Sequence, residues 1–190
     1  MKNIKVDLLV DANGLSCPMP IVKLKKGMAQ LEVGQVVELQ STDKGSMADV
    51  KAWANNTGYQ YLGSFQDEGV FKHYIRKESS NEVIEKKHEI ITTNDELIKK
   101  IDAKEDIQIV DVREEAEYVF AHIPNAISMP LGDLEENISK LSKDKEVYVI
   151  CRTGHRSDLA AQILSDNGFN KVINVIPGMS NWTGDVEGIN

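Results

Sequence analysis

The chain holds two cysteines, and each stands directly before a segment with helical character. The first lies in the stretch DANGLSCPMP over residues 11–20, and the second opens the stretch CRTGHRS over residues 151–157. A thiol at a helix N-terminus, among backbone N–H groups and cations, is placed to become a thiolate. We therefore expect both Cys17 and Cys151 to be ionised and accessible, and to act together in thiol chemistry.

The surroundings of Cys151 predict an anion site. An apolar segment over 147–150 precedes this cysteine, and sites in open α/β sheets form at the carboxyl ends of strands. A loop there can turn several N–H groups toward one centre, and the following helix adds partial positive charge. Arg152, His155 and Arg156 add more, against the acidic background of this half of the chain. This pattern favours a thiolate that holds an anion on or near the sulfur.

The same loop fits two other interpretations. In the first, Cys151 is only a small buried apolar residue in a turn. In the second, the loop belongs to a cysteine phosphatase, which uses the same kind of anion nest. The motif of those enzymes has five residues between the cysteine and the arginine (Cys-x5-Arg). Here four residues separate Cys151 from Arg156 (Cys-x4-Arg). The shorter loop makes a tighter ring, which suits one sulfur atom better than a tetrahedral phosphate.

Residues 88–185 resemble the rhodanese (thiosulfate sulfurtransferase) family. Several motifs occur in the family's order, namely DVRE at 111–114, HIPNA at 122–126, MPL at 129–131, the Cys151 loop, Gly168-Phe169 and Trp182. The resemblance implies that Cys151 takes a sulfane sulfur from thiosulfate or a low-molecular-weight persulfide and holds it as Cys–S–S⁻. The residues implied in binding it are Arg152, Thr153, Gly154, His155, Arg156 and Ser157.

The sequence departs from the family pattern at three positions. Ala121 and Asn125 replace glycines around the His-Ile-Pro step, and Asn tolerates a left-handed backbone. Met179 replaces a glycine after Gly178, which is expected to reshape one wall of the pocket. Three further polar residues fit either a pocket or a structural salt bridge with its hydrogen bonds, and the structural interpretation is preferred for them: Asp111, Arg113 and His122.

The segment around Cys17 resembles the TusA/SirA-like family of small sulfur carriers over residues 5–77. The match rests on D-x-x-G-L-x-C-P-x-P at 11–20 and on Thr42-Asp43 before a helix that contains Trp53. It implies that Cys17 carries a persulfide and hands sulfur to another protein, without a cofactor. Some members of this broad family lie in regulatory contexts. The lysines that follow, at 23, 25 and 26, fit a solvated helix face or a docking face for an acidic partner.

Composition is ordinary for a globular protein of 190 residues, with 41% hydrophobic and 27% charged residues. Residues 1–80 hold 10 Lys+Arg and 9 Asp+Glu, a charge of +1, and residues 81–190 hold 12 and 21, a charge of −9, which together give −8. Neither half is basic enough to predict nucleic-acid binding. No apolar run reaches the length of a membrane span, no signal peptide is evident, and no Cys/His cluster has zinc spacing. A cytoplasmic protein without a metal is therefore expected.

Periodicity and turn residues predict an α/β protein of two domains, 1–77 and 89–190, joined by a polar linker over 78–88. The first domain reads as a β-α-β-α-β-β two-layer sandwich, with strands near 4–11, 36–40, 59–65 and 70–76, the last two joined by a turn over 66–69, and helices from Pro18 to 31 and over 45–56. The second helix is expected to be capped by Asp43, to end at Gly58 and to place three residues on one face: Met47, Val50 and Trp53. The second reads as a parallel sheet with helices on both faces, which agrees with the rhodanese-like fold that the resemblance implies. Its strands are expected near 90–91, 107–110, 126–128, 146–150 and 171–175, and its helices near 94–101, with Thr93 or Asn94 as the cap, 114–120, 131–138 and 156–167.

Together, the two halves suggest a sulfur relay. Cys151 loads first, because its loop is the more cationic, and passes sulfur through Cys17 to a thiol or protein acceptor. One alternative is a persulfide- or redox-sensing protein, or a carrier, without significant turnover. Another is that only the rhodanese half is active and the N-terminal half docks a partner.

Overall fold

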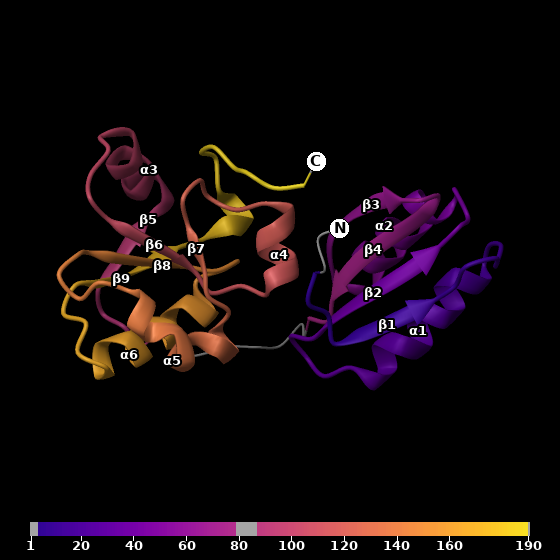
Figure 1. Cartoon of the computed structure of the whole chain (residues 1–190), viewed down its shortest axis with the longest axis horizontal. Coiled ribbons are helices and arrows are strands. Elements are labelled where there is room, and N and C mark those ends of the chain that lie inside the picture. The colour runs from indigo at the N-terminus through magenta and orange to yellow at the C-terminus, as the bar shows by residue number, and fades with distance from the viewer. Residues whose placement is uncertain (1–3, 79–86, 190) are drawn as a thin grey trace. The chain divides into compact units, whose positions relative to one another are not determined.

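The computed structural model describes residues 4–78 and 87–189 of the chain (Figure 1). These residues form two compact units, one within 4–78 and the other within 87–188. The linker predicted over 78–88 lies mainly outside the described residues. The domain boundaries themselves, 1–77 and 89–190, stay predictions.

The N-terminal unit is the predicted β-α-β-α-β-β sandwich. Its elements in chain order are β1 (Leu8–Asp11), α1 (Met19–Gln30), β2 (Val36–Ser41), α2 (Ser46–Thr57), β3 (Gln60–Asp67) and β4 (Val70–Arg76). The sheet has the order β1-β2-β4-β3, in which β1 runs parallel to β2 and the other pairs are antiparallel. Apolar side chains of both helices and of β2 and β4 form one core, which includes Leu24, Met28, Val37, Leu39, Val50, Ala54 and Ile75.

The start of this unit differs in detail from the expectation. The first strand begins at Leu8 rather than at residue 4, and α1 begins at Met19. Pro18 is therefore the residue before the helix, and Pro20 lies in the first turn. A proline is tolerated at these positions because the N–H groups of a first turn have no partner within the helix.

The second helix also differs from its predicted pattern. Val50 is fully buried, but Met47, expected on the same face, is 42% exposed. Steps of three residues drift by about 60° each around an α-helix, so the buried face passes through Val50 and Ala54 instead. Asp43 stabilises the turn before the helix, because its Oδ1 accepts a hydrogen bond from the Gly45 N–H at 3.1 Å. Gly58 ends the helix in the left-handed conformation, as predicted.

The hairpin between β3 and β4 is tighter than the predicted four-residue turn. The strands extend to Asp67 and Val70, which leaves Glu68 and Gly69 as a two-residue loop. Both loop residues have positive φ, at 48° and 86°. That geometry matches the twist of the flanking strands and fixes their register.

The C-terminal unit is a parallel α/β sheet. Its elements in chain order are β5 (Ile91–Thr93), α3 (Asn94–Asp102), β6 (Gln108–Asp111), α4 (Glu115–Phe120), β7 (Ile127–Ser128), η1 (Leu131–Asp133), α5 (Leu134–Asn137), η2 (Ile138–Lys140), β8 (Val147–Ile150), α6 (His155–Asp166), β9 (Val172–Ile176) and η3 (Met179–Asn181). The strand order is β5-β9-β8-β6-β7, and every pair is parallel. The strand β8, which leads into Cys151, is thus central in the sheet.

Helices cover both faces of this sheet, as predicted. On one face, Val147 and Val149 of β8 pack with Ala160, Ala161 and Leu164 of α6. On the other face, neighbouring strand residues, Tyr148 and Ile150 among them, pack with Leu97 of α3. This burial on both faces explains why β8 is apolar along its whole length. It also fixes the end of β8, where the second cysteine lies.

Local signals position the helix α3 at the edge of the sheet. The Thr93 hydroxyl accepts a hydrogen bond from the Glu96 N–H at 3.3 Å, and the Glu96 carboxylate returns a contact to the Thr93 N–H. This is a capping box, so the predicted start of the helix at Thr93 or Asn94 is confirmed.

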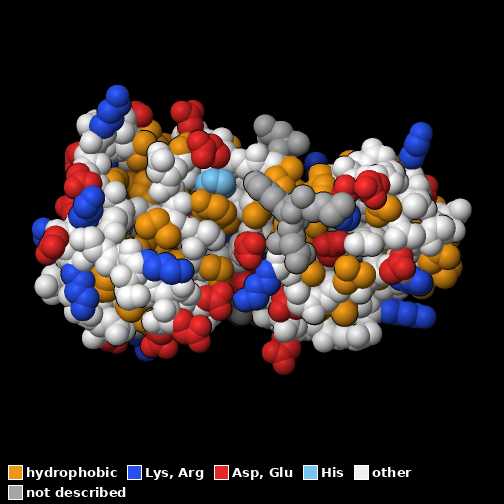
Figure 2. Space-filling view, in the orientation of Figure 1, with side chains coloured by type: hydrophobic (Ala, Val, Ile, Leu, Met, Phe, Trp, Pro, Cys, Tyr) orange, Lys and Arg blue, Asp and Glu red, His pale blue; other side chains and the backbone are white. Residues whose placement is uncertain are grey.

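Acidic and basic side chains are interspersed with apolar ones over the visible face of the described residues (Figure 2). Among these residues, none of the helices combines the length and the apolar character needed to cross a membrane. Nor does any group of three His, Cys, Asp or Glu side chains in 4–78 and 87–189 come together to hold a metal ion.

Candidate functional site

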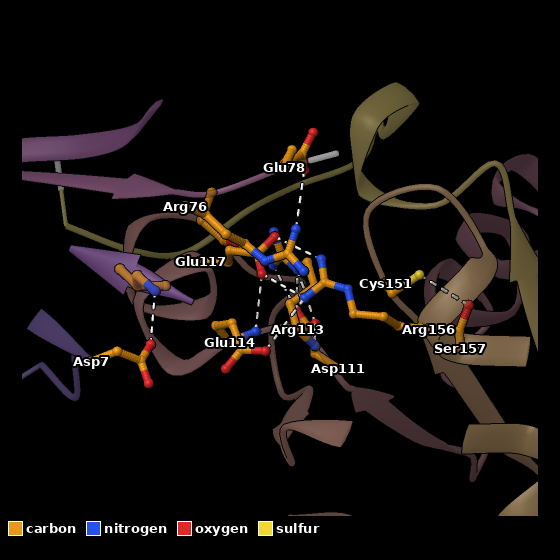
Figure 3. Close-up of polar contacts among 12 residues, drawn as sticks. Asp7, Arg76, Glu78, Asp111, Arg113, Glu114, Glu117, Cys151, Arg156 and Ser157 are labelled. Atoms are coloured by element: carbon orange, nitrogen blue, oxygen red, sulfur yellow. Dashed lines mark hydrogen bonds and ion pairs between the residues drawn. The ribbon is translucent and has the colours of Figure 1, made fainter. Parts of the chain in front are cut away.

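Cys151 follows the last residue of β8 and lies at the carboxyl end of the parallel sheet, where α6 begins. Its side chain is buried, with 1% exposed, so the expectation of an accessible thiol is wrong for the resting structure. The Gly154 N–H donates to Sγ at 3.1 Å. The Ser157 hydroxyl lies 3.3 Å from the same sulfur, as Figure 3 shows. Gly154 takes φ 88°, a left-handed conformation that turns its N–H inward. The sulfur therefore sits among donors at a helix N-terminus.

A second polar layer supports this cradle. The Ser157 hydroxyl lies 2.6 Å from Oδ1 of Asn174, a fully buried residue of β9. The Asn174 Nδ2 donates to the Gly154 carbonyl at 3.2 Å. These contacts close a ring of polar groups through Cys151, Ser157, Asn174 and Gly154. The sequence interpretation missed Asn174, although a lone polar residue in the apolar strand Val172–Ile176 is a usable signal.

The segment after β9 is hydrogen-bonded to the backbone of the Cys151 loop. The Met179 N–H donates to the Cys151 carbonyl at 2.8 Å, and the Ser180 N–H donates to the Arg152 carbonyl at 2.9 Å. A Cβ on Gly178 would lie 2.4 Å from the Cys151 carbonyl oxygen, so only glycine permits this approach. Met179 itself packs against the apolar cluster that contains Leu97.

The cationic residues of the loop behave differently from one another. Arg156 reaches Glu117 of α4 with two hydrogen bonds, at 2.7 and 3.0 Å, and lies 3.9 Å from Glu114 (Figure 3). Burial alone would lower the pKa of the guanidinium, but the Glu117 carboxylate outweighs it and the pKa is raised. Arg156 is thus a charged, carboxylate-paired side chain rather than an unpaired cation. Its partner Glu117, which is 3% exposed, was not identified from the sequence.

The remaining loop residues lie around the rim. Arg152 is half-buried, and Thr153 is exposed. His155 is also half-buried, and its Nδ1 makes no hydrogen bond within the part of the chain that the structure describes. Of the six predicted binding residues, the structure places Gly154 and Ser157 within hydrogen-bond distance of the sulfur. The binding roles of Arg152, Thr153, His155 and Arg156 stay predictions.

Asp111 and Arg113 form the structural salt bridge that was preferred for them. Both are buried, and the Arg113 Nη2 donates to Asp111 Oδ2 at 2.6 Å and to the Ala121 carbonyl at 2.6 Å. His122 stacks on Tyr118 at 3.8 Å between ring centroids, and its Nδ1 lies 2.7 Å from the Tyr118 carbonyl oxygen. These contacts organise the turn before β7.

The nearby glycine replacements are explained by backbone geometry. Asn125 has φ 64°, so it adopts the left-handed conformation expected of it. Ala121 has φ −159°, an extended conformation open to any residue.

Cys17 is exposed and lies two residues before α1. The helix end offers it few donors, because Pro18 and Pro20 have no N–H and the Met19 N–H bonds to the Ser16 carbonyl at 3.0 Å. The Gly14 N–H donates to the Thr42 hydroxyl at 2.8 Å and holds the Cys17 loop beside the turn that leads to α2.

That neighbouring turn brings carboxylates to the thiol. Local desolvation and a hydrogen bond with the Asp49 carboxylate raise the pKa of Cys17, and the charges of Asp49 and Asp43 act in the same direction. The expectation that the helix N-terminus ionises this thiol is therefore wrong. Asp49 lies in the first turn of α2 and gave no signal in the sequence, since acidic residues are common there.

The three lysines of α1 lie on its exposed side. Lys23 donates to the Asp11 carbonyl at 2.8 Å, so its ammonium group caps the end of β1. Lys25 and Lys26 are exposed on the same helix, as expected for a solvated face.

Comparisons with known protein families divide the chain in the same way. The family "Sulfurtransferase TusA" matches residues 9–77, and the family "Rhodanese-like domain" matches residues 93–185. A Bacillus subtilis (strain 168) protein named "Putative sulfur carrier protein YrkF" is 45% identical over 97% of this chain and 100% of its own length. The "Sulfur carrier protein TusA" of Allochromatium vinosum is 39% identical over 37% of this chain and 93% of its own length.

Solved structures agree for the C-terminal unit. A rhodanese-like domain from Anabaena is 29% identical, with a TM-score of 0.50, over 54% of this chain and 81% of that one. A rhodanese-like domain protein from Staphylococcus aureus is 32% identical, also with a TM-score of 0.50, over 53% of this chain and 99% of that one. The family matches, the full-length relative and the fold agree that this chain belongs to the sulfur carrier and sulfurtransferase family in which a TusA domain is fused to a rhodanese-like domain.

Proposed function

We propose that the protein takes sulfane sulfur onto Cys151 as a persulfide and relays it through Cys17 to a thiol or protein acceptor. Thiosulfate and low-molecular-weight persulfides are the proposed donors, and no cofactor is needed. The observation that carries this proposal is the contrast between the two thiols. Cys151 lies among hydrogen-bond donors at a helix N-terminus, whereas Cys17 is exposed beside carboxylates.

This contrast supports the order of the two steps. An anionic donor such as thiosulfate is attracted by the donors around Cys151 and repelled by the charges of Asp43 and Asp49 around Cys17. Attack by the Cys151 thiolate on the outer donor sulfur forms one S–S bond and breaks another, and sulfite or a thiolate leaves with the electron pair. The transferred sulfur then lies about 2 Å beyond Sγ, and the relay requires this outer sulfur, not Sγ, to be reached by the acceptor.

The second step suits the exposed thiol. Cys17 attacks the outer sulfur of the Cys151 persulfide, and the S–S bond passes to Cys17 while the Cys151 thiolate leaves. Because the pKa of Cys17 is raised, the thiol must lose its proton before it attacks. The hydrogen-bonded Asp49 carboxylate can accept that proton. An exposed carrier thiol is also the one that a partner protein can reach.

Intact-mass measurement of single Cys→Ser variants tests the relay. After exposure to thiosulfate or glutathione persulfide, we expect Cys17→Ser to gain one sulfur on Cys151 and Cys151→Ser to remain unloaded. Peptide mapping of the unsubstituted protein should then show sulfur on both cysteines. If Cys17 loads at the same rate without Cys151, the ordered relay is wrong.

A carrier or sensor without significant turnover is the second candidate. It is favoured by the name of the relative that matches the full chain, which is that of a sulfur carrier. Steady-state sulfur transfer from thiosulfate to cyanide or to a thiol separates the two functions. Repeated turnover supports the enzyme, whereas a single equivalent of transferred sulfur supports the carrier.

A further inference from the structure

The buried ring beside Cys151 has one hydroxyl hydrogen placed between two acceptors. The Ser157 hydroxyl lies within hydrogen-bond distance of two acceptors, Cys151 Sγ at 3.3 Å and Asn174 Oδ1 at 2.6 Å. A serine hydroxyl carries a single hydrogen and can donate to only one of them at a time. All three side chains are at most 1% exposed, so bulk water does not supply a further donor, and with the hydroxyl turned to Asn174 the sulfur keeps the Gly154 N–H as its donor.

The geometry favours Asn174 as the acceptor. Its Oδ1 is much closer to the hydroxyl than the sulfur is, and its amide is held in that orientation because Nδ2 donates to the Gly154 carbonyl. With the hydrogen directed at Asn174, the Ser157 oxygen presents lone pairs to the sulfur. Lone pairs suit a thiol, whose S–H can donate, but they give a thiolate no hydrogen bond.

We propose that Asn174 is a positioning residue that withholds the Ser157 hydrogen from Cys151 and so disfavours the empty thiolate relative to the sulfur-loaded state. The consequence for loading rests on the proposed function. When the thiolate attacks a donor, the Sγ–S bond forms, the donor's S–S bond breaks and sulfite or a thiolate leaves with the electron pair. The negative charge then resides on the outer sulfur, beyond the ring, and Sγ becomes a neutral divalent sulfur. In this sulfur-loaded state the Ser157 hydroxyl keeps its hydrogen bond to Asn174, and the neutral Sγ loses no stabilisation because of it.

A double-mutant cycle tests this competition in the full chain, in a Cys17→Ser background that leaves one thiol. The pH profile of iodoacetamide alkylation is measured for Asn174→Leu, Ser157→Ala and the double variant. We expect Asn174→Leu to speed alkylation at neutral pH by about threefold or more and to shift the profile to lower pH, because the freed hydrogen now stabilises the thiolate.

Ser157→Ala alone is expected to change the neutral rate by less than about twofold, since its hydrogen is already committed to Asn174. In the Ser157→Ala background, Asn174→Leu should no longer shift the profile. The alkylation rate at high pH, where the thiol is fully ionised, reports how accessible the buried sulfur is. It is evaluated separately from the midpoint of the pH profile. The ionisable side chains around the loop are unchanged in every variant: Arg152, His155, Arg156, Glu114 and Glu117.

Two outcomes would overturn the proposal. One is a large slowing by Ser157→Ala, which would mean that the hydroxyl already donates to the thiolate. The other is an equal shift by Asn174→Leu with and without the hydroxyl, which a merely structural role would give. Ser157→Ala decides the matter even where Asn174→Leu fails to fold. Because alkylation needs no sulfur donor, a protein that passes this cycle but never gains sulfur from thiosulfate would refute the proposed function and leave the role of Asn174 intact.

Discussion

Cys151 and Cys17 occupy similar places in the sequence and opposite environments in the structure. Both stand just before a helix, yet one helix end turns a glycine N–H toward the sulfur and the other begins with prolines. Cys151 is buried among donors, whereas Cys17 is exposed and hydrogen-bonded with a carboxylate. A position before a helix is therefore not enough to ionise a thiol, because the donors that remain free and the charges that arrive from elsewhere decide the outcome.

The largest difference between the two sites should appear when the buried ion pair of the Cys151 loop is broken. Glu117→Gln takes the hydrogen-bonded carboxylate from Arg156 and leaves only the Glu114 carboxylate at 3.9 Å, so the free energy of unfolding of the C-terminal unit should fall by about 3–5 kcal/mol. Urea unfolding with Trp53→Phe, so that Trp182 is the fluorescent reporter, measures it. Adding Arg156→Met should recover much of the loss; no recovery would mean that the charge is not the cause.

Two glycines allow the same substitution to be compared at both sites. Gly178→Ala places a Cβ 2.4 Å from the Cys151 carbonyl oxygen, in a backbone region with φ 88° and ψ −158° that is nearly exclusive to glycine. We expect a loss of roughly 3 kcal/mol or more in unfolding free energy and loss of sulfur loading. At the Cys17 site, Gly14→Ala meets no atom within 4 Å and should cost only about 1–2 kcal/mol. Similar losses at both positions would refute the role given to Gly178.

The two units should also respond differently to acid. His73 in the N-terminal unit is fully buried, with Nε2 at 3.0 Å from the Ser46 hydroxyl and Nδ1 at 3.2 Å from the Tyr61 hydroxyl. Burial lowers its pKa from 6.5 to about 4. The unfolded chain therefore binds the proton first, so this stabilisation is complete above pH 6.5 and is lost as the pH falls toward 4, by about 3 kcal/mol in all.

The acid response of the two units can be compared by fluorescence, since each unit holds one tryptophan. Urea midpoints read from Trp53 should drop between pH 7 and pH 4.5 by more than those read from Trp182, in variants that keep one tryptophan each. His73→Asn should flatten the Trp53 response. A pH dependence that survives this substitution would assign the effect to other groups.

The smallest effect concerns the charge beside Cys17. In a Cys151→Ser background, Asp49→Asn should lower the pKa of the Cys17 thiol, because both the hydrogen bond and the charge that raise it are weakened. Iodoacetamide alkylation at neutral pH should then be faster, and its pH midpoint lower. Glu32→Gln, at an exposed acidic residue of the same unit, is the matched control and should change neither. An unchanged midpoint in Asp49→Asn would remove the electrostatic contrast between the two thiols.

Much of the fold follows from local patterns. The alternation of apolar strands and amphipathic helices predicted both architectures, and residues such as Thr93, Asn125 and Gly58 marked a helix start, a left-handed turn and a helix end. The errors lie at element ends and at the exposed Met47, where a three-residue spacing was taken for one helix face. Such details depend on which side of a helix meets the core, and that depends on packing.

The candidate site was predictable only in part, for the same reason. The sequence by itself pointed to the two thiols as candidates, and it predicted that Cys151 follows a buried strand and precedes a loop that can turn N–H groups toward it. The tertiary structure decided what each thiol faces, through Glu117 beside Arg156, Asn174 beside Ser157 and Asp49 beside Cys17. These partners come from separate elements of the fold, and local periodicity does not encode the distances between elements. Charge and hydrogen-bond effects act through those distances, so the chemistry of each sulfur was settled only when the chain folded.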